Sequence, residues 1–292
     1  MKIMVCVKQV IDISMPFEVD PATNTVKWEV AELHLLNPAD GWAVQRAVQL
    51  KDELKDGTVT AVSLGQERVV KALRECLSLG ADAAIRIDNS SLGVPLDAFG
   101  TALVLSRYID RLRPDLVFCG AASADIGSRS VGPMLAEVLG LPHVSDVVDF
   151  RVESGHGLVA ERQLSRGDRE SVWCPLPALL TLVATGCSRY VSLPMLMRAM
   201  RATVQTLDLK ELGLGGPQDS HGLNATRLEK VSPPRPRPRK IYMPDSNLPP
   251  EERLRLLLAG GPRRRQPTNT LEGTPEELAD GAINFMRQLR IL

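Results

Sequence analysis

The sequence predicts an α/β fold, a twisted parallel sheet with helices on both faces, followed by a C-terminal arm. Short β-branched apolar runs alternate with amphipathic helical stretches from residue 3 to residue 139, which is typical of parallel sheets. Gly, Pro and Asn mark the ends of these segments. After about residue 213 the periodicity gives way to Pro- and Arg-rich sequence. We therefore expect an α/β domain over 1–212 and a linker with a helical arm over 213–292.

Each expected element has a local reason. The strands are short buried runs, expected at residues 3–7, 59–63, 83–87, 116–119, 158–164 and 178–183. The first helix begins at Asn37 and Pro38, since Asn is a good N-cap and Pro suits the first helical position, and Val44, Ala47, Val48 and Leu54 share one face. Further helices are expected at residues 69–79, 97–112, 132–139, 194–201, 249–258 and 275–289.

The composition is that of a globular protein with balanced charge. Lys and Arg number 35, as do Asp and Glu, so the net charge gives no reason to expect nucleic acid or a membrane surface. The 5 cysteines form no C-x-x-C pair, which argues against a metal site or a disulfide framework. No apolar stretch is long enough to span a bilayer, and we see no targeting segment. We expect a cytoplasmic protein without membrane insertion.

The most distinctive segment is the small-residue loop of residues 120–133, between a strand and a helix. Such a loop lets backbone N–H groups approach a phosphate at a helix N-terminus. Ser128 and Ser130 could donate hydroxyl hydrogen bonds, and Arg129 could supply a charge. Asp125 would orient the loop or accept from a ribose hydroxyl. The alternative is an ordinary tight connection, since neither a Walker loop nor a G-x-G-x-x-G fingerprint is present.

Side chains that could run a reaction are not evident. The 4 histidines are scattered, and none accompanies a Ser or Cys in a nucleophile motif. No metal-ligand set has the right spacing. These observations favour a binding or carrier role.

A Met-rich basic segment follows the sheet region, within residues 187–201. Leu193, Pro194, Met195 and Met197 belong to it. Met-rich surfaces adapt to different partners, although such a stripe also fits a protein core. The last helix is joined through a Pro-rich linker, so it packs either on its own domain or on a partner chain.

An ordered set of motifs resembles one family. The motifs are Val5-Cys6-Val7-Lys8-Gln9-Val10, Asn37-Pro38, Leu79-Gly80-Ala81-Asp82, the loop 120–133, and Arg189-Tyr190 followed by Leu193-Pro194. In this order, over residues 1–210, they resemble electron transfer flavoprotein beta subunits. The resemblance implies the adenine-nucleotide α-hydrolase-like fold of universal stress proteins and ATP pyrophosphatases.

The resemblance also implies cofactors and partners. An alpha subunit would hold most of an FAD, and this chain would bind AMP or a second FAD in its place, through Cys6, Asn37, Pro38, Ala39, Asp40, Leu64, Gly120, Asp125, Gly127, Ser128, Arg129, Ser130 and Val131. Leu193, with Pro194, Met195 and Met197, would recognise flavoprotein dehydrogenases such as acyl-CoA dehydrogenases. Electrons would pass to a quinone oxidoreductase or respiratory acceptor. The chain would be a carrier subunit without catalytic residues of its own.

Some positions depart from the family pattern. Asp125 is followed by Ile126, Gly127, Ser128 and Arg129 instead of further acids, while Ile13 and Gln163 replace an aromatic residue and a Glu. A bifurcating flavoprotein with two FAD, or a lone ATP-binding stress-protein-like domain, stays an alternative. The basic segment 233–240 could bind nucleic acid or anionic lipid, but a solvated linker or a complement to an acidic partner surface is the more common role of such sequence. A second basic cluster lies at 263–265.

Overall fold

The computed structural model describes residues 1–12, 14, 18–20, 22–23, 25–26, 34–93, 95–153, 157–186, 189–214, 223–227, 229–231, 243–246, 248–258 and 273–288. Ile13 and the basic clusters at 233–240 and 263–265 lie outside these residues. The chain divides into two compact units, Met1–Ser232 and Pro233–Leu292. Residues 213–232 group with the first unit, while the functional division expected after residue 212 stays a prediction.

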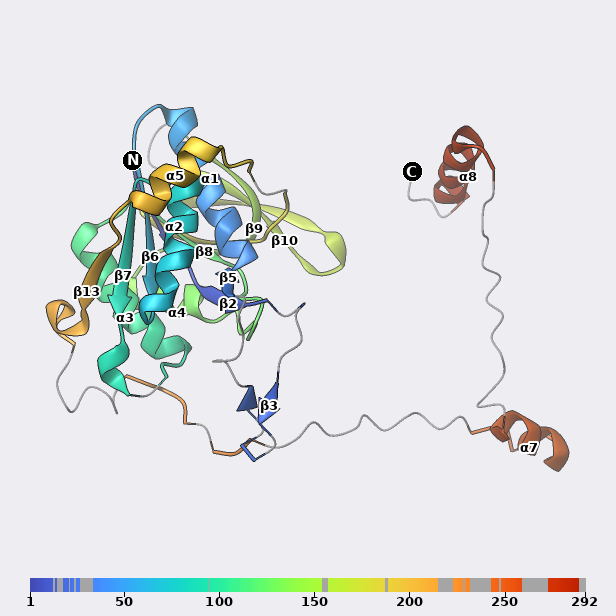
Figure 1. Ribbon diagram of the computed structural model, residues 1–292. Coiled ribbons are helices and arrows are strands. Elements are labelled where there is room, and N and C mark those ends of the chain that lie inside the picture. Colours follow the sequence, from blue (N-terminus) through green and yellow to red (C-terminus); the bar gives the residue numbers. More distant parts are fainter. Residues whose placement is uncertain are drawn as a thin grey trace. The chain divides into compact units, whose positions relative to one another are not determined.

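The first unit is built on a sheet of nine strands in the order β11-β10-β9-β12-β8-β1-β6-β7-β13 (Figure 1). The strands are β1 (Lys2–Cys6), β6 (Thr58–Leu64), β7 (Ala83–Asp88), β8 (Leu116–Gly120), β9 (His143–Glu153), β10 (Gly157–Gln163), β11 (Arg169–Pro175), β12 (Ala178–Leu182) and β13 (Gln205–Asp208). Two small sheets pair β2 (Gln9–Ile11) with β5 (His34–Leu36), and β3 (Val19–Asp20) with β4 (Thr25–Val26).

The central strand β1 lies parallel to both β6 and β8. Its alternating side chains enter two different apolar clusters. Ile3 and Val5 belong to the first cluster, whereas Met4 and Cys6 belong to the second. Because successive residues of a strand point to opposite faces, a continuous apolar run is what a sheet covered on both sides requires.

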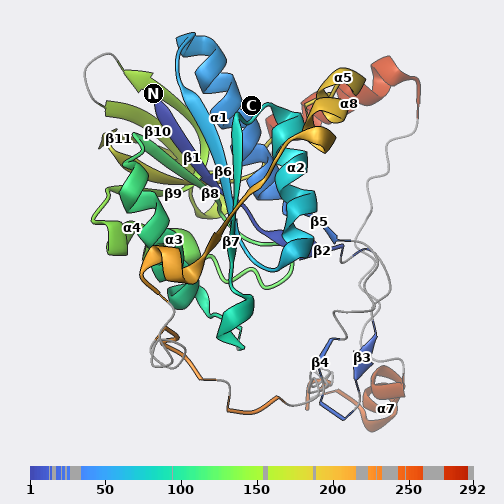
Figure 2. The same ribbon diagram turned by 60° about the vertical axis from the view of Figure 1, so that its left-hand side comes forward.

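Helices cover both faces of the sheet (Figures 1 and 2). Helices α1 (Pro38–Leu54) and α2 (Val70–Leu79) pack into the first cluster, and α3 (Ala98–Leu112) and α4 (Val131–Leu139) pack into the second. Helix α5 (Leu193–Arg201) contacts α2. Short 3-10 turns are η1 (Glu67–Val69), η2 (Ser90–Leu92), η3 (Ser165–Gly167) and η4 (Leu209–Leu212). The expected α/β fold is confirmed.

Some elements differ from the prediction. Strands β9 and β11 were not expected; with β10 they form an antiparallel meander beyond the parallel part of the sheet. Their apolar residues alternate with charged ones such as Asp149 and Arg151, so they lack the continuous apolar runs that identify the central strands. Leu54 was expected on the buried face of α1 but is exposed, because the helical periodicity continues into a last turn that lies at the surface.

The second unit contains α7 (Pro250–Leu258) and α8 (Pro275–Gln288), both at sites where the sequence predicts helices. Helix α8 begins with reciprocal hydrogen bonds between Thr274 and Glu277: the Thr274 N–H donates to Glu277 Oε2 at 2.8 Å, and the Glu277 N–H donates to Thr274 Oγ1 at 3.4 Å. This is a capping box. Among the described residues, no helix has the length and apolar character needed to cross a membrane.

Candidate functional site

The carboxyl ends of β1, β6 and β8 lie beside one another because these strands are parallel neighbours in the sheet. Cys6, Leu64 and Gly120 are their last residues. The first turn of α1, from Pro38 to Asp40, lies at the same edge, because Asp40 is hydrogen-bonded to Gly120. In open parallel sheets, ligands bind outside this edge, so it is the candidate site.

Asp40 joins the ends of two strands. One carboxylate oxygen accepts the backbone N–H of Lys8 at 2.7 Å, after β1, and the other accepts the N–H of Gly120 at 2.9 Å, at the end of β8. The side chain is buried. Burial raises the pKa of Asp40 to about 7, although hydrogen bonds from the Lys8 backbone, Asn37 and the Gly120 backbone act in the opposite direction. With both oxygens engaged, Asp40 braces the site rather than facing outward.

Gly120 permits this close approach. A Cβ at this position would come within 2.2 Å of Asp40 Oδ1 and 2.9 Å of Ala39 Cβ. The backbone of β8 can therefore meet the start of α1 only where no side chain intervenes. This explains the glycine at the beginning of the small-residue loop.

Asn37 holds the next part of the loop. Its Nδ2 donates to the Ala122 carbonyl at 3.1 Å, and its Oδ1 accepts the Ala124 N–H at 3.0 Å. The sequence predicts Asn37 as an N-cap, and its position before α1 is correct, but its side chain makes no cap hydrogen bond. The amide is instead committed to the loop, because both of its ends match backbone groups there.

Asp125 is held by a lysine that sequence reasoning did not single out. The Lys8 ammonium lies 2.7 Å from Asp125 Oδ2. Burial alone would raise the pKa of Asp125, but hydrogen bonds from Lys8, Ser123 and the Ile126 N–H, with the Lys8 charge, lower it below its ordinary value. The sequence offered two roles for Asp125, and this geometry favours the one that orients the loop. The sequence feature that could have identified Lys8 is its position as a charged residue directly after an apolar strand.

The N-terminus of α4 follows the end of this loop and has no side-chain cap. The Ser130 hydroxyl donates to the Ser128 carbonyl at 2.8 Å and does not cap the helix. Within the described chain, no protein group accepts the N–H of Val131 or Gly132. A Cβ at Gly132 would come within 2.3 Å of Thr181 Cγ2, so the helix start lies close to β12. Free N–H groups at a helix N-terminus suit an anion such as a phosphate.

Arg129 points toward a neighbouring pocket. Its φ angle is 56°, and its guanidinium forms an ion pair with Asp146 at 2.7 Å. The pocket beside it has a volume of about 410 Å³ and is also lined by Arg162 and Gln163. The positive charge of Arg129, which the sequence suggested for binding a phosphate, is thus paired with Asp146.

The remaining predicted residues occupy different positions at this edge. Pro38 and Ala39 form the first turn of α1, and Gly127 adopts a φ of 66° in the loop. The Cys6 side chain belongs to the second apolar cluster, so a ligand would meet its backbone rather than its thiol. Cys6, Cys76, Cys119 and Cys174 are free thiols.

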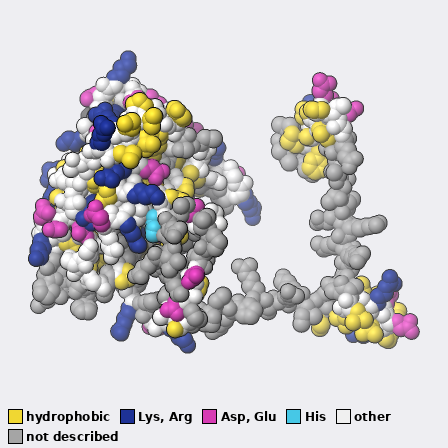
Figure 3. Space-filling view, viewed as in Figure 1, with side chains coloured by type: hydrophobic (Ala, Val, Ile, Leu, Met, Phe, Trp, Pro, Cys, Tyr) yellow, Lys and Arg dark blue, Asp and Glu magenta, His cyan; other side chains and the backbone are white. Residues whose placement is uncertain are grey.

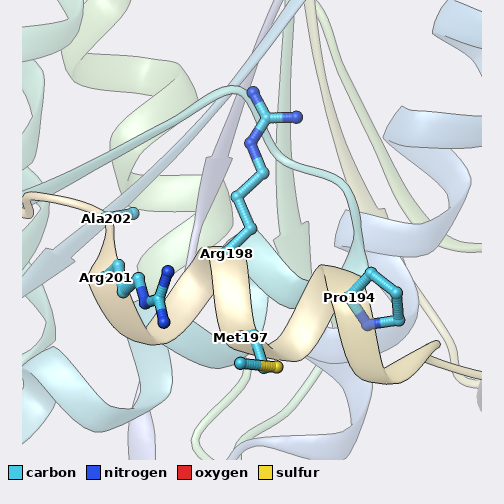
Figure 4. Close-up of a pocket in the computed structure, with 5 residues that line it drawn as sticks. All are labelled: Pro194, Met197, Arg198, Arg201 and Ala202. Atoms are coloured by element: carbon cyan, nitrogen blue, oxygen red, sulfur yellow. The ribbon is translucent and has the colours of Figure 1, made fainter.

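Helix α5 forms a second, separate surface. Leu193 is 66 % exposed, and Leu196, Met197 and Met200 are also exposed, so hydrophobic side chains gather over α5 in the space-filling view (Figure 3). A pocket of about 490 Å³ lies along the helix, lined by Pro194, Met197, Arg198, Arg201 and Ala202 (Figure 4). Among the residues of α5, only Ala199 is buried. Core packing, the alternative for this Met-rich segment, does not describe most of its side chains.

The chain was then compared with known proteins. Residues 27–212 match the model of the electron transfer flavoprotein domain. An electron transfer flavoprotein subunit beta from Thermoanaerobacterium thermosaccharolyticum is 34% identical over 226 residues, 74% of this chain and 84% of that protein. The chain belongs to the electron transfer flavoprotein family. Its role within this family is that of a beta-type subunit, an electron carrier that works with an alpha subunit and a flavin.

Other members of the electron transfer flavoprotein family show the same extent of similarity. Protein FixA of Azotobacter vinelandii is 32% identical over 254 residues, 84% of this chain and 88% of that protein. Subunit CarD of the caffeyl-CoA reductase-Etf complex of Acetobacterium woodii is 32% identical over 239 residues, 80% of this chain and 88% of that protein. The match to the family model at residues 27–212 covers the strands from β5 to β13, the start of α1, the loop after β8 and α5, but not β1.

Proposed function

We propose that this chain pairs with an FAD-carrying alpha subunit, binds AMP at the carboxyl edge of its sheet, and docks flavoprotein dehydrogenases on α5. Electrons from a dehydrogenase such as an acyl-CoA dehydrogenase would pass through the pair to a quinone oxidoreductase or respiratory acceptor. The FAD, when bound, supplies the redox chemistry. The protein chain holds the nucleotide, completes the pair and receives the partner.

The observation that carries the nucleotide assignment is the fixed loop between β8 and α4. Asn37, Asp40 and Lys8 each hold a different part of it, while the N–H groups at the start of α4 have no protein acceptor within the described chain. A preformed frame with free donors suits one phosphate. This supports a mononucleotide contacting Gly120, Asp125, Gly127 and the residues from Ser128 to Val131.

The exposed face of α5 supports the docking assignment. Leu193 stands at the first position of the helix, and the segment before it is anchored to α1, where the Arg189 N–H donates to Gln45 Oε1 at 2.8 Å. Apolar residues with arginines beside them are typical of the centre of protein interfaces. The pocket between Met197 and Arg198 suits an apolar or acidic side chain of the partner.

We assign no bond-making step to the side chains of this chain. Asp40, whose pKa burial raises to about 7, has both oxygens engaged by backbone N–H groups, which suits bracing rather than proton transfer to a substrate. The free thiols support a reducing compartment such as the cytoplasm. The role that remains is carriage and recognition.

The deciding experiment is co-expression with the alpha subunit, followed by acid release and quantification of bound nucleotides. One FAD and one AMP per heterodimer are the expected result. Two FAD and no AMP would contradict the AMP assignment. If the chain binds no flavin and forms no stable heterodimer, the whole proposal is contradicted, and a lone ATP-binding domain is the remaining interpretation.

The bifurcating alternative has one observation in its favour. Among the relatives is a subunit named as part of a caffeyl-CoA reductase-Etf complex. In that alternative a second FAD would occupy the adenylate site. Arg129, which is paired with Asp146 at the border of the neighbouring pocket, would then lie where the ligand extends beyond its first phosphate. The number of FAD and AMP molecules bound per heterodimer distinguishes the AMP proposal from the bifurcating alternative.

A further inference from the structure

The chain that connects β12 to α5 meets helix α1 at Gly186. A Cβ added to Gly186 would come within 2.1 Å of Cη2 and 2.4 Å of Cζ3 of the Trp42 indole. These distances are far shorter than van der Waals contact. Residue 186 can therefore lie against the indole only because it has no side chain.

The backbone at Gly186 gives no other reason for a glycine. Its φ is not in the left-handed region that favours this residue, and the residue is exposed, so the core does not require a small side chain there. The Trp42 indole is half-buried and packs on the first apolar cluster. The indole is thus a fixed surface on which the backbone of residue 186 rests.

Two further contacts hold the same segment on α1. The Arg189 N–H donates to Gln45 Oε1 at 2.8 Å, and the Arg189 guanidinium lies 3.7 Å from Asp52 Oδ2. At about 3.6 residues per turn, residues 42, 45 and 52 share one face of the helix. Because the ion pair is exposed, it contributes little to stability, so Trp42 and Gln45 provide the main support on α1.

The supported segment leads directly into the docking helix. Helix α5 begins at Leu193, whose side chain is exposed. Leu193 itself therefore does little to hold the first turn in place. The backbone on either side of it is held by Val191, which packs on the first apolar cluster, and by the buried Ala199. A displacement at Gly186 would be passed to Leu193 through this short stretch of chain.

We propose that Trp42 is a positioning residue for partner docking: through its contact with Gly186, the indole fixes where Leu193 is presented to a dehydrogenase. A side chain at residue 186 would displace the segment from α1 and misplace Leu193. The flavin and the nucleotide would stay bound, since Asn37 and Asp40 do not contact this segment. This inference rests on the docking role of α5 proposed above.

The test is stopped-flow reduction of the heterodimer at increasing concentrations of an acyl-CoA dehydrogenase, which separates the half-saturating concentration from the limiting rate. Gly186→Ala should raise the half-saturating concentration about fivefold, as coupling between residues in contact allows, with the limiting rate and the bound FAD unchanged. Combined with Trp42→Leu, whose shorter side chain leaves room for the methyl group, Gly186→Ala should change that concentration by less than about twofold. Trp42→Phe takes the place of Trp42→Leu if that variant fails to fold.

Gly41→Ala is the matched control, because the same substitution on α1 places a Cβ that meets only the Leu36 side chain, at 3.4 Å. It should keep the wild-type values. An unchanged half-saturating concentration in Gly186→Ala, or an equal increase with and without Trp42→Leu, would overturn the role of Trp42. If Leu193→Ala leaves the half-saturating concentration unchanged, the docking function of α5 is itself contradicted, and this inference with it.

Discussion

The carboxyl edge of the sheet and the face of α5 are built in opposite ways. At the sheet edge, Asn37 and Asp40 are buried, and each makes two hydrogen bonds to backbone groups of the neighbouring segments. On α5, large apolar side chains such as Leu193 and Met200 are exposed. The first region is a buried polar frame held by internal hydrogen bonds, and the second is an exposed apolar surface.

This difference separates stability from function in the two regions. Residues of the sheet edge support the fold and, in the proposed function, the nucleotide, so their substitution should change the free energy of unfolding and nucleotide binding together. Residues on the apolar face of α5 hold little of the fold, so their substitution should change only recognition. The experiments below test this separation, beginning with the largest expected change in stability.

Gly120→Val should cause the largest loss. Its Cβ would overlap Asp40 Oδ1, which lies 2.2 Å from that position, and overpacking of this kind costs about 3 kcal/mol. Urea unfolding and AMP titration would measure both losses. Gly41→Ala is the control, because a Cβ there meets only the Leu36 side chain, at 3.4 Å. A stable, nucleotide-binding Gly120→Val protein would refute the close-packed edge.

Asp40→Asn should change the pH dependence of stability. The pKa of Asp40 rises from 3.8 to about 7 on folding, so between these values the folded protein keeps a proton that the unfolded chain has lost. The protonated Asp40 carboxyl of the wild type therefore makes its full contribution to folding stability below pH 4, and this contribution decreases as pH rises to 7. Since one pKa unit corresponds to about 1.4 kcal/mol, the free energy of unfolding of the wild type should fall by a few kcal/mol relative to that of Asp40→Asn between pH 4 and pH 7.

Unfolding free energies of the wild type and the Asp40→Asn variant, measured from pH 4 to pH 7, would check this prediction. The comparison removes the titration of other groups such as Glu75 and His143, whose pKa values are also shifted. Parallel curves would show that Asp40 does not titrate in this range.

Asn37→Ala should cost about 1–2 kcal/mol, because the Ala124 N–H and the Ala122 carbonyl lose their partner. It should also weaken AMP binding by loosening the loop. Asn224→Ala is a matched control, since Asn224 also bridges two backbone groups, the Asp97 N–H and the Pro95 carbonyl. Equal loss of AMP affinity in both variants would mean that the effect is one of general stability.

Leu193→Ala should change stability least, by no more than about 0.5 kcal/mol, as is usual for a surface position. Stopped-flow reduction of the heterodimer by an acyl-CoA dehydrogenase should nevertheless slow by about tenfold, the loss expected for an interface anchor. Leu112→Ala, at another exposed leucine, should leave the rate unchanged. A normal rate with Leu193→Ala would remove α5 from the proposed dock.

Much of the fold could be predicted because the central strands are buried on both faces and read as uninterrupted apolar runs. The helix expected over 97–112 also forms, and Asp97 caps it by accepting the Gly100 N–H at 2.8 Å. Strands β9 and β11 were missed because polar residues interrupt their apolar ones, although β10 between them was predicted. Within the site, local spacing identified Asn37 and the loop, but could not show that Lys8 reaches Asp125, 117 residues away.

The position of β12 has a consequence for how the chain folds. This strand, residues 178–182, lies between β8 and β9, which both precede it in the sequence. Until it is synthesised, each of those strands presents an unpaired edge that can join another chain. Such exposed edges promote aggregation of incomplete chains. A nascent chain that stops at residue 175 would therefore contain two parts of the sheet that are not yet joined. Both exposed edges become paired only when the five residues of β12 have been synthesised.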